Sequence, residues 1–251
     1  MNTDWPHGDN IYNHLEPGIR ITLEMGSGAN ATAYSLSNGQ VLKCLVHDKK
    51  FHSIDEFKNE FDREVSMQTT FYMMGIGPQL YHSFCYKDGK DFYGIIVMEK
   101  VETLDRYFLR LSDSTLTSIE FIQTVLNKLQ HLLGTMCGAD LVHGDMMLHN
   151  MYVITDSNDN LIRLGLLDFG NASHKHGGYI LLDFIAFLRS LSALVDEGEF
   201  KELIHLEQIT RTTFMFIRNC DLEFSYKALN PTRNNIRIEH LRLLDKYIET
   251  I

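Results

Sequence analysis

Asp145, Asn150 and Asp168 have the residue types and the spacing that phosphoryl transfer requires. Asp145 and Asn150 lie five positions apart after an apolar Leu-Val pair, and Asp168 follows 18 residues later, after a second apolar segment. Phosphoryl transfer needs a group that orients the attacking hydroxyl and oxygen ligands that hold a divalent cation on the nucleotide phosphates. We therefore predict that Asp145 positions the acceptor hydroxyl and that Asn150 and Asp168 bind Mg²⁺ or Mn²⁺.

Two further candidate features lie closer to the N-terminus, a glycine turn and a strand lysine. Gly26-Ser27-Gly28-Ala29 separates two predicted strands. Glycines at such a turn let backbone N–H groups approach phosphate oxygens, although an ordinary hairpin turn would have the same composition. Lys43 lies in an apolar segment, where strand alternation places it on the opposite face from its two neighbours. A solvated lysine on an edge strand is the alternative.

The hydrophobic pattern predicts a β-rich first part of the chain and a helical second part. Five strands are expected, at 19–25, 32–36, 41–46, 80–86 and 92–98. One helix is expected at 54–73, with Phe57, Phe61, Val65 and Tyr72 on its apolar face. The second part predicts helices at 118–137 and 179–195, short strands at 151–155 and 161–167, and two or three more helices before residue 251.

Taken together, these motifs resemble the protein-kinase-like superfamily, with His143-Gly144-Asp145 in place of the commoner His-Arg-Asp. The resemblance covers residues 19 to 190. Within the superfamily, the chain resembles minimal or atypical kinases: the KEOPS-complex kinase, RIO-type kinases and compact effector or viral kinases. It implies an α+β, bilobal protein-kinase-like fold. The expected parts are an N-terminal extension at 1–18, an N-lobe at 19–100 with a five-stranded antiparallel sheet and one helix, and a mainly helical C-lobe at 101–251.

The resemblance also assigns roles to the candidate residues. Lys43 is expected to contact the α- and β-phosphates and to pair with a glutamate of the following helix. Glu60 and Glu64 share a helix face, and we favour Glu64 because family members often carry an Arg-Glu pair at this place. The nucleotide contacts implied for the turn and the lobe boundary are Gly26, Ser27, Gly28, Ala29, Met98, Glu99 and Val101. The implied cofactors are ATP and Mg²⁺, with Mn²⁺ as a substitute.

The chain departs from ordinary protein kinases around the catalytic loop. Met147 occupies the position where Ser/Thr kinases carry a lysine, and His149 is a candidate substitute. Gly144 replaces the arginine that pairs with a phosphorylated activation loop. Only 12 residues separate Gly170 from Asp183, which resembles the helix aspartate that braces the catalytic loop. We therefore expect a short activation segment and no control by loop phosphorylation.

Composition restricts the partners. The net charge of −10 argues against nucleic-acid and anionic-membrane binding. The four cysteines are widely spaced, which indicates reduced thiols rather than a disulfide framework. No secretory signal or apolar span is visible, so we expect a cytoplasmic protein, or one delivered to a host cytosol if it is an effector or viral protein.

Three functions compete for this sequence. The leading hypothesis is a minimal Ser/Thr protein kinase, with a protein substrate and an activating or scaffold protein as expected partners. The second is a small-molecule kinase of the aminoglycoside or choline type, which also uses His-Gly-Asp and a following Asn. The third is an ATPase or nucleotide-gated binding module in a partner complex. Lys43, Asp145, Asn150 and Asp168 are all present, which weighs against a pseudokinase.

Overall fold

The computed structural model describes residues 9–28, 31–47, 53–89, 91–111, 115, 119–174, 183–184, 186–187 and 190. The chain forms two compact units, and each is described by itself. The first unit comprises Met1–Glu102 and Gly165–Ala172, and the second comprises Thr103–Leu164 and Ser173–Ile251.

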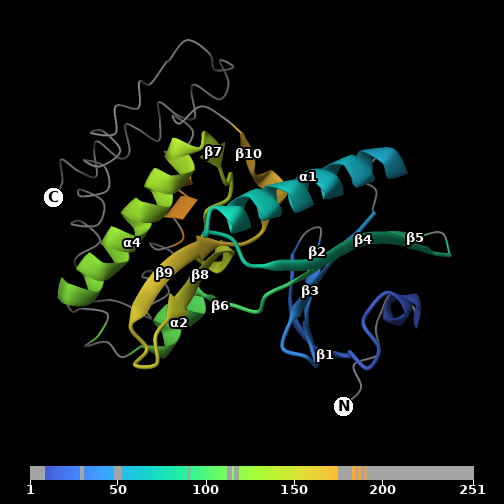
Figure 1. Ribbon diagram of the computed structural model, residues 1–251, viewed down its shortest axis with the longest axis horizontal. Coiled ribbons are helices and arrows are strands. Elements are labelled where there is room, and N and C mark those ends of the chain that lie inside the picture. Colours follow the sequence, from blue (N-terminus) through green and yellow to red (C-terminus); the bar gives the residue numbers. More distant parts are fainter. Residues whose placement is uncertain are drawn as a thin grey trace, which may run out of the picture. The chain divides into compact units, whose positions relative to one another are not determined.

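A five-stranded antiparallel sheet forms the centre of the first unit (Figure 1). Its spatial order is β1-β2-β3-β5-β4, and each neighbouring pair of strands is antiparallel. The strands are β1 (Ile21–Ser27), β2 (Ala31–Leu36), β3 (Val41–Val46), β4 (Leu80–Asp88) and β5 (Asp91–Met98). The predicted five-stranded sheet is therefore confirmed. Gly39, in the β2–β3 turn, has a φ of 83°, a left-handed conformation that glycine adopts without steric cost.

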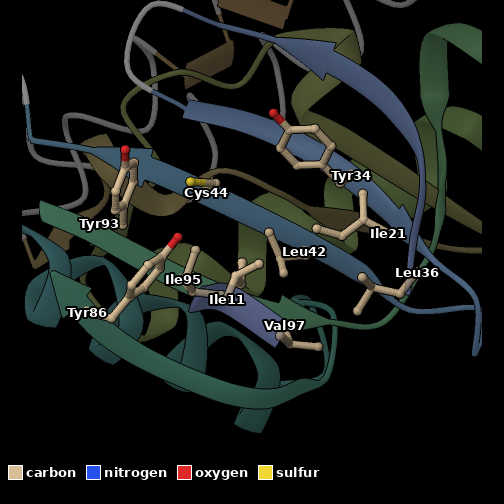
Figure 2. Packing of buried hydrophobic residues seen from close by; sticks show 10 residues of the cluster. All are labelled: Ile11, Ile21, Tyr34, Leu36, Leu42, Cys44, Tyr86, Tyr93, Ile95 and Val97. Carbon is tan, nitrogen blue, oxygen red and sulfur yellow. The ribbon is translucent and has the colours of Figure 1, made fainter. Parts of the chain in front are cut away.

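One face of this sheet carries the apolar core shown in Figure 2. Residues of all five strands contribute to it, and Ile11 joins them from the short 3₁₀ helix η1 (Asp9–Asn13). The ring of His14 lies 5.0 Å from that of Phe84 and 5.6 Å from that of Tyr86, measured between centroids. The segment before β1 thus covers this face and keeps its aromatic and branched side chains out of water, each stabilising the fold by about 1.5–3 kcal/mol.

Helix α1 (Ile54–Met73) packs on the opposite face of the sheet. Tyr93 belongs to the core of Figure 2, so its strand neighbours Phe92 and Gly94 point the other way. The ring of Phe57 meets that of Phe92 edge-on at 5.6 Å, and a Cβ added at Gly94 would lie 2.5 Å from Phe61. Glycine is required at this position because α1 approaches the strand so closely.

The buried face of α1 differs from the predicted one. Phe57 and Phe61 are buried as expected, but Val65 is only partly buried and Tyr72 is 40% exposed. The helix instead buries Glu64, Met67, Gln68 and Phe71. The prediction was wrong because it followed apolar residues only, whereas the buried stripe includes two polar residues with partners inside the unit.

The described part of the second unit contains helices and short strands (Figure 1). Its helices are α2 (Leu104–Arg110) and α4 (Ile119–Gly138). A two-stranded sheet pairs β7 (Leu141–Val142) with β10 (Ser173–His174), and a three-stranded sheet has the order β6-β8-β9. The three-stranded sheet consists of β6 (Glu102–Thr103), β8 (Met151–Thr155) and β9 (Leu161–Leu166). The first residue of β6 and the last two residues of β9 are assigned to the first unit.

The helix predicted at 118–137 is observed as α4, and it has an apolar stripe where side chains are described. Val125, Leu129, Leu133 and Met136 are all buried. The turn between β8 and β9 is fixed to α2, because Arg110 pairs with the carboxylate of Asp159. Most of the predicted helix at 179–195 and all of the region after residue 195 lie outside the described residues, although the five described residues between 183 and 190 are helical. Within the part of the chain that the structure describes, no helix is both long and apolar enough to cross a membrane.

Candidate active site

An ion-pair cluster in the first unit joins three of the predicted site residues. The ammonium group of Lys43 donates to Glu64 Oε1 at 2.6 Å and to Asp168 Oδ1 at 2.7 Å. The side chain of Lys43 is 11% exposed and that of Glu64 is 6% exposed, whereas that of Asp168 is 51% exposed. One lysine therefore links a buried carboxylate on α1 with a carboxylate that remains open to solvent and to a ligand.

The sequence places each member of this cluster for a simple local reason. Leu42 and Cys44 face the core on the other side of β3, so strand alternation turns Lys43 toward α1. Glu64 lies on the buried face of α1, and it rather than Glu60 is the partner of the lysine. Glu60 pairs with Arg63 at 2.7 Å. The structure thus identifies Glu64, and not Glu60, as the glutamate that pairs with Lys43. The catalytic roles of Lys43 and Glu64 stay predictions.

The electrostatics of the cluster keep Lys43 charged. Burial by itself lowers the pKa of Lys43, but the nearby carboxylates of Glu64 and Asp168, which also accept its hydrogen bonds, raise that pKa above its ordinary value. The ammonium group thus carries a full positive charge at neutral pH. The ammonium group can bind the anionic phosphates of a nucleotide, and the exposed carboxylate beside it can bind the metal ion that accompanies those phosphates.

Asp168 begins a tight segment that packs against α1. Its backbone adopts φ 60° and ψ 78°, the left-handed conformation, immediately before the 3₁₀ helix η3 (Phe169–Asn171). The ring of Phe169 lies 4.7 Å from that of Phe71, and just before the turn Leu166 donates to the carbonyl of Ile76 at 2.8 Å. A Cβ at Gly170 would lie 3.4 Å from Glu64 Oε2, so this turn lies directly beside the cluster.

The predicted phosphate-binding turn begins in the last two residues of β1 and leads into β2. Gly28 donates its backbone N–H to the carbonyl of Ala31 at 2.8 Å, and the hydroxyls of Ser27 and Thr32 lie 3.1 Å apart. A Cβ at Gly26 would meet nothing within 4 Å, so this side of the turn is open. Ala29, the fourth predicted residue, lies outside the described residues.

The predicted adenine-side residues follow the end of β5. Met98 is the last residue of the strand, and its sulfur accepts a hydrogen bond from the buried Gln68 of α1 at 3.5 Å. The backbone N–H of Glu99 donates to the carbonyl of Gln79 at 2.9 Å, and Val101 is partly buried. The assignment of these residues to a purine site stays a prediction.

In the second unit, Asp183 holds the start of the loop that carries Asp145. Its two carboxylate oxygens accept hydrogen bonds from the backbone N–H groups of His143 and Gly144, each at 2.7 Å. Gly144 has a φ of 83°, which explains why glycine is found at this position. Asp183 is 1% exposed, and burial raises its pKa although His143 and both N–H groups act against that rise. The predicted bracing role of Asp183 thus has a direct geometric basis.

The same loop brings Asp145 and Asn150 together. The amide nitrogen of Asn150 donates to the backbone carbonyl of Asp145 and to its carboxylate oxygen Oδ2, both at 3.0 Å. His143 is buried and accepts from the N–H of Asp145 through Nδ1 at 3.3 Å, so it supports the loop, whereas His149 is exposed. Asp145 is thereby held in one orientation, as a group that positions a hydroxyl must be.

Asn150 and Asp168 each present an oxygen of the kind that binds a divalent cation. Because both hydrogen bonds of Asn150 use its nitrogen, no described residue binds its amide oxygen, which is a hard ligand of the kind that Mg²⁺ prefers. Asp168 is half exposed and anchored through one oxygen on Lys43. Each residue, taken by itself, therefore offers an oxygen that suits Mg²⁺, an ion that would neutralise phosphate charge, and the assignment of both as ligands stays a prediction.

Sequence reasoning missed two residues that support the site. The hydroxyl of Ser190 accepts from the backbone N–H of Leu148, two positions before Asn150, at 3.0 Å. Arg63, next to Glu64, binds backbone carbonyls beyond Asp168. Neither role has a sequence signature, because in each case the partner is a backbone group far along the chain.

The comparisons with known proteins identify one family. Residues 18–201, more than half of the chain, match the model of the family described as "Lipopolysaccharide kinase (Kdo/WaaP) family". A search of the curated proteins finds no match.

Proposed function

The chain belongs to the lipopolysaccharide kinase (Kdo/WaaP) family, and from this premise we propose that it transfers the γ-phosphoryl group of ATP to a hydroxyl group in a Mg²⁺-dependent reaction. The family belongs to the protein-kinase-like superfamily, so the broad resemblance predicted from the sequence is confirmed. The narrower resemblance to KEOPS-complex or RIO-type kinases gains no support. The chain is accordingly a member of a family of phosphotransferases.

The observation that carries the proposal is the bridging position of Lys43. A lysine that contacts both a buried helix glutamate and an exposed aspartate matches the arrangement that phosphoryl transfer by this superfamily requires. In our proposal Lys43 binds the nucleotide phosphates, Glu64 fixes the lysine, and Asp168 is the cation ligand. For the residues of the second unit, the proposed roles are the orientation of the acceptor for Asp145 and cation binding for Asn150.

The proposed reaction balances as follows. The acceptor hydroxyl oxygen forms a bond to the γ-phosphorus of ATP, and the bond between that phosphorus and the β–γ bridging oxygen breaks. ADP leaves with the bond's electron pair. The hydroxyl proton passes to the carboxylate of Asp145 late in the step, because an aspartate is a weak base and acts mainly by positioning.

We propose a sugar hydroxyl as the first acceptor to test, because the family's description names lipopolysaccharide. A serine or threonine hydroxyl of a protein is the second candidate. Two observations favour the protein acceptor. The chain's charge of −10 is unfavourable for binding a polyanionic glycan. Only 12 residues lie between Gly170 and Asp183, which leaves little room for the extra substrate-binding helices of small-molecule kinases. The partner proteins and the compartment expected from the sequence belong to this second candidate and stay proposals.

One assay separates these functions. The full-length chain is incubated with γ-labelled ATP and Mg²⁺, together with Kdo-containing core oligosaccharide, with generic protein substrates, or with neither, beside an Asp145→Asn control. Label in the oligosaccharide supports the sugar kinase and label in protein supports the Ser/Thr kinase. ADP release without labelled acceptor supports an ATPase. Absence of both ADP and labelled product, or equal rates for the control, contradicts the proposal.

A further inference from the structure

Arg63 makes contacts that its place in the sequence does not suggest. It precedes Glu64 on α1, and its guanidinium group donates from Nη1 to the backbone carbonyl of Ala172 at 2.9 Å and from Nη2 to that of Gly170. The same Nη2 also donates to Glu60 at 2.7 Å. One side chain therefore holds two carbonyl groups of the segment that follows Asp168.

The segment 168–172 depends on residues outside it to hold its conformation. Asp168 is a non-glycine residue in the left-handed conformation, which costs about 1–2 kcal/mol relative to the right-handed one. Inside the segment, one backbone hydrogen bond, from Ala172 to the carbonyl of Phe169 at 3.0 Å, closes the 3₁₀ turn. A single 3₁₀ turn is weak by itself. Its conformation therefore depends on what the surrounding residues hold in place.

Helix α1 supplies this support at two points. Glu64 holds the carboxylate end of Asp168 indirectly, through Lys43. Arg63, its neighbour in the chain, holds the backbone on the far side of the turn through Gly170 and Ala172. The turn is thus fixed between two adjacent residues of one helix, so that a shift of α1 would move both supports together.

An ordinary surface ion pair is the competing explanation for Arg63. Glu60 and Arg63 are spaced i, i+3 and their side chains are 53% and 37% exposed, so that pair contributes little. The two carbonyl bonds are different, since they are charge-assisted and reach residues more than 100 positions away. The planar guanidinium fork donates to the two carbonyls from two different nitrogens, whereas a lysine ammonium group would have to reach both from one nitrogen.

We propose that Arg63 is a positioning residue, which fixes the proposed metal ligand Asp168 by binding the carbonyls of Gly170 and Ala172. This inference rests on the proposed function and adds a regulatory property to it. The support uses backbone carbonyls and needs no phosphate group, which suits a chain whose catalytic loop has Gly144 where an arginine would bind a phosphorylated loop. The metal-binding turn is held in place by the unmodified chain.

The first test uses hydrogen exchange without any ligand. In Arg63→Ala the amides of 168–172 are expected to exchange at least about tenfold faster than in the wild type, while the amides of β3 and β5 keep their rates. Glu60→Gln is the matched control, because it removes the charge of the exposed partner and leaves both carbonyl bonds. Unchanged exchange at 168–172 in Arg63→Ala overturns the inference.

The second test measures metal binding rather than turnover. Mn²⁺ affinity is determined by electron paramagnetic resonance with a non-hydrolysable ATP analogue present. Arg63→Ala is expected to weaken Mn²⁺ binding at least about tenfold, Arg63→Lys by less, and Glu60→Gln not at all. Should Arg63→Ala fail to fold, Arg63→Lys carries the test, and wild-type affinity in it counts against the inference.

Asp168→Ala separates the two levels of the proposal. If Asp168→Ala loses Mn²⁺ affinity and Arg63→Ala does not, the positioning role of Arg63 is wrong and the proposed function stands. If Asp168→Ala binds Mn²⁺ as the wild type does, Asp168 is not a metal ligand, and the proposed function fails together with the inference.

Discussion

The ion pair between Lys43 and Glu64 predicts an asymmetric response to mutation. Lys43→Met removes the charge and keeps an unbranched side chain, and Glu64→Gln removes the other charge without changing shape. Lys43 is the partner of Glu64 in the described part of the structure, so the methionine variant leaves a carboxylate buried with its charge uncompensated. The glutamine variant leaves Lys43 with its second acceptor, Asp168, at 2.7 Å.

The magnitudes follow from burial and distance. Opposite charges about 4 Å apart attract by about 4 kcal/mol at an effective dielectric constant of about 20, and desolvation of the two groups offsets part of this. Removing one partner of a nearly buried pair costs about 3–5 kcal/mol when the other charge is left alone. We expect a loss of about 3 kcal/mol for Lys43→Met, about 1 kcal/mol for Glu64→Gln, and a coupling of about 1–2 kcal/mol in the double mutant.

Native-state hydrogen exchange is the appropriate assay, because a chain with two compact units need not unfold in one step. The denaturant dependence of exchange at the central amides of α1 gives the unfolding free energy of the first unit. Glu60→Gln is the control, with an expected change below about 0.5 kcal/mol since its pair with Arg63 is exposed. A Glu64→Gln variant as unstable as Lys43→Met, or a coupling near zero, would refute this account of the cluster.

Three further predictions concern other parts of the fold. Burial is the main cause that raises the pKa of the Cys85 thiol to about 11, so at pH 8 its thiolate fraction is about a hundredfold below that of an ordinary thiol with a pKa near 9. Alkylation by iodoacetamide, followed by peptide mass spectrometry, should be slow at pH 8 and rise steadily toward pH 11; ordinary reactivity at pH 8 would be evidence against burial. Asp183→Asn leaves one of the two backbone N–H groups, of His143 (buried) or Gly144 (partly buried), without its acceptor, at a cost of about 1–3 kcal/mol. Hydrogen exchange at the start of the catalytic loop should then speed up at least about tenfold, and unaltered rates would show that the carboxylate does not support the loop. Gly94→Ala forces a methyl group to 2.5 Å from the ring of Phe61 and should destabilise the first unit by about 1–3 kcal/mol, measured by the same exchange method. Gly26→Ala is its control, because that position is open.

Much of the first unit could be predicted because its local signals agree with its tertiary packing. The predicted bounds of β3, α1 and β8 are those observed, and the remaining predicted strands differ by at most two residues at either end. Lys43 could be placed on its face because strand alternation has an exact period of two. The family match confirms the superfamily and leaves the acceptor open, since acceptor choice depends on surfaces rather than on the motif.

Other features could not be predicted because they depend on tertiary contacts. Helix α2 is only seven residues long, too short for a periodic pattern to distinguish it. The exposure of Tyr72 follows from the burial of Glu64 and Gln68, which an apolar pattern ignores. The role of Arg63 depends on two carbonyl groups, and every residue carries a carbonyl. The spacing of residues along the chain can identify side chains of suitable chemistry, but it does not indicate which backbone carbonyls accept hydrogen bonds from them.

The central claim is that Lys43, Glu64 and Asp168 form the phosphate and metal end of a nucleotide site. Calorimetric titration of the full-length chain with a non-hydrolysable ATP analogue, with and without Mg²⁺, tests it most directly. The account predicts that the wild type binds the analogue more tightly with Mg²⁺, that Asp168→Ala loses this Mg²⁺-dependent gain, and that Lys43→Met weakens binding at least about tenfold. No binding by the wild type, or equal affinities in all three proteins, would contradict it.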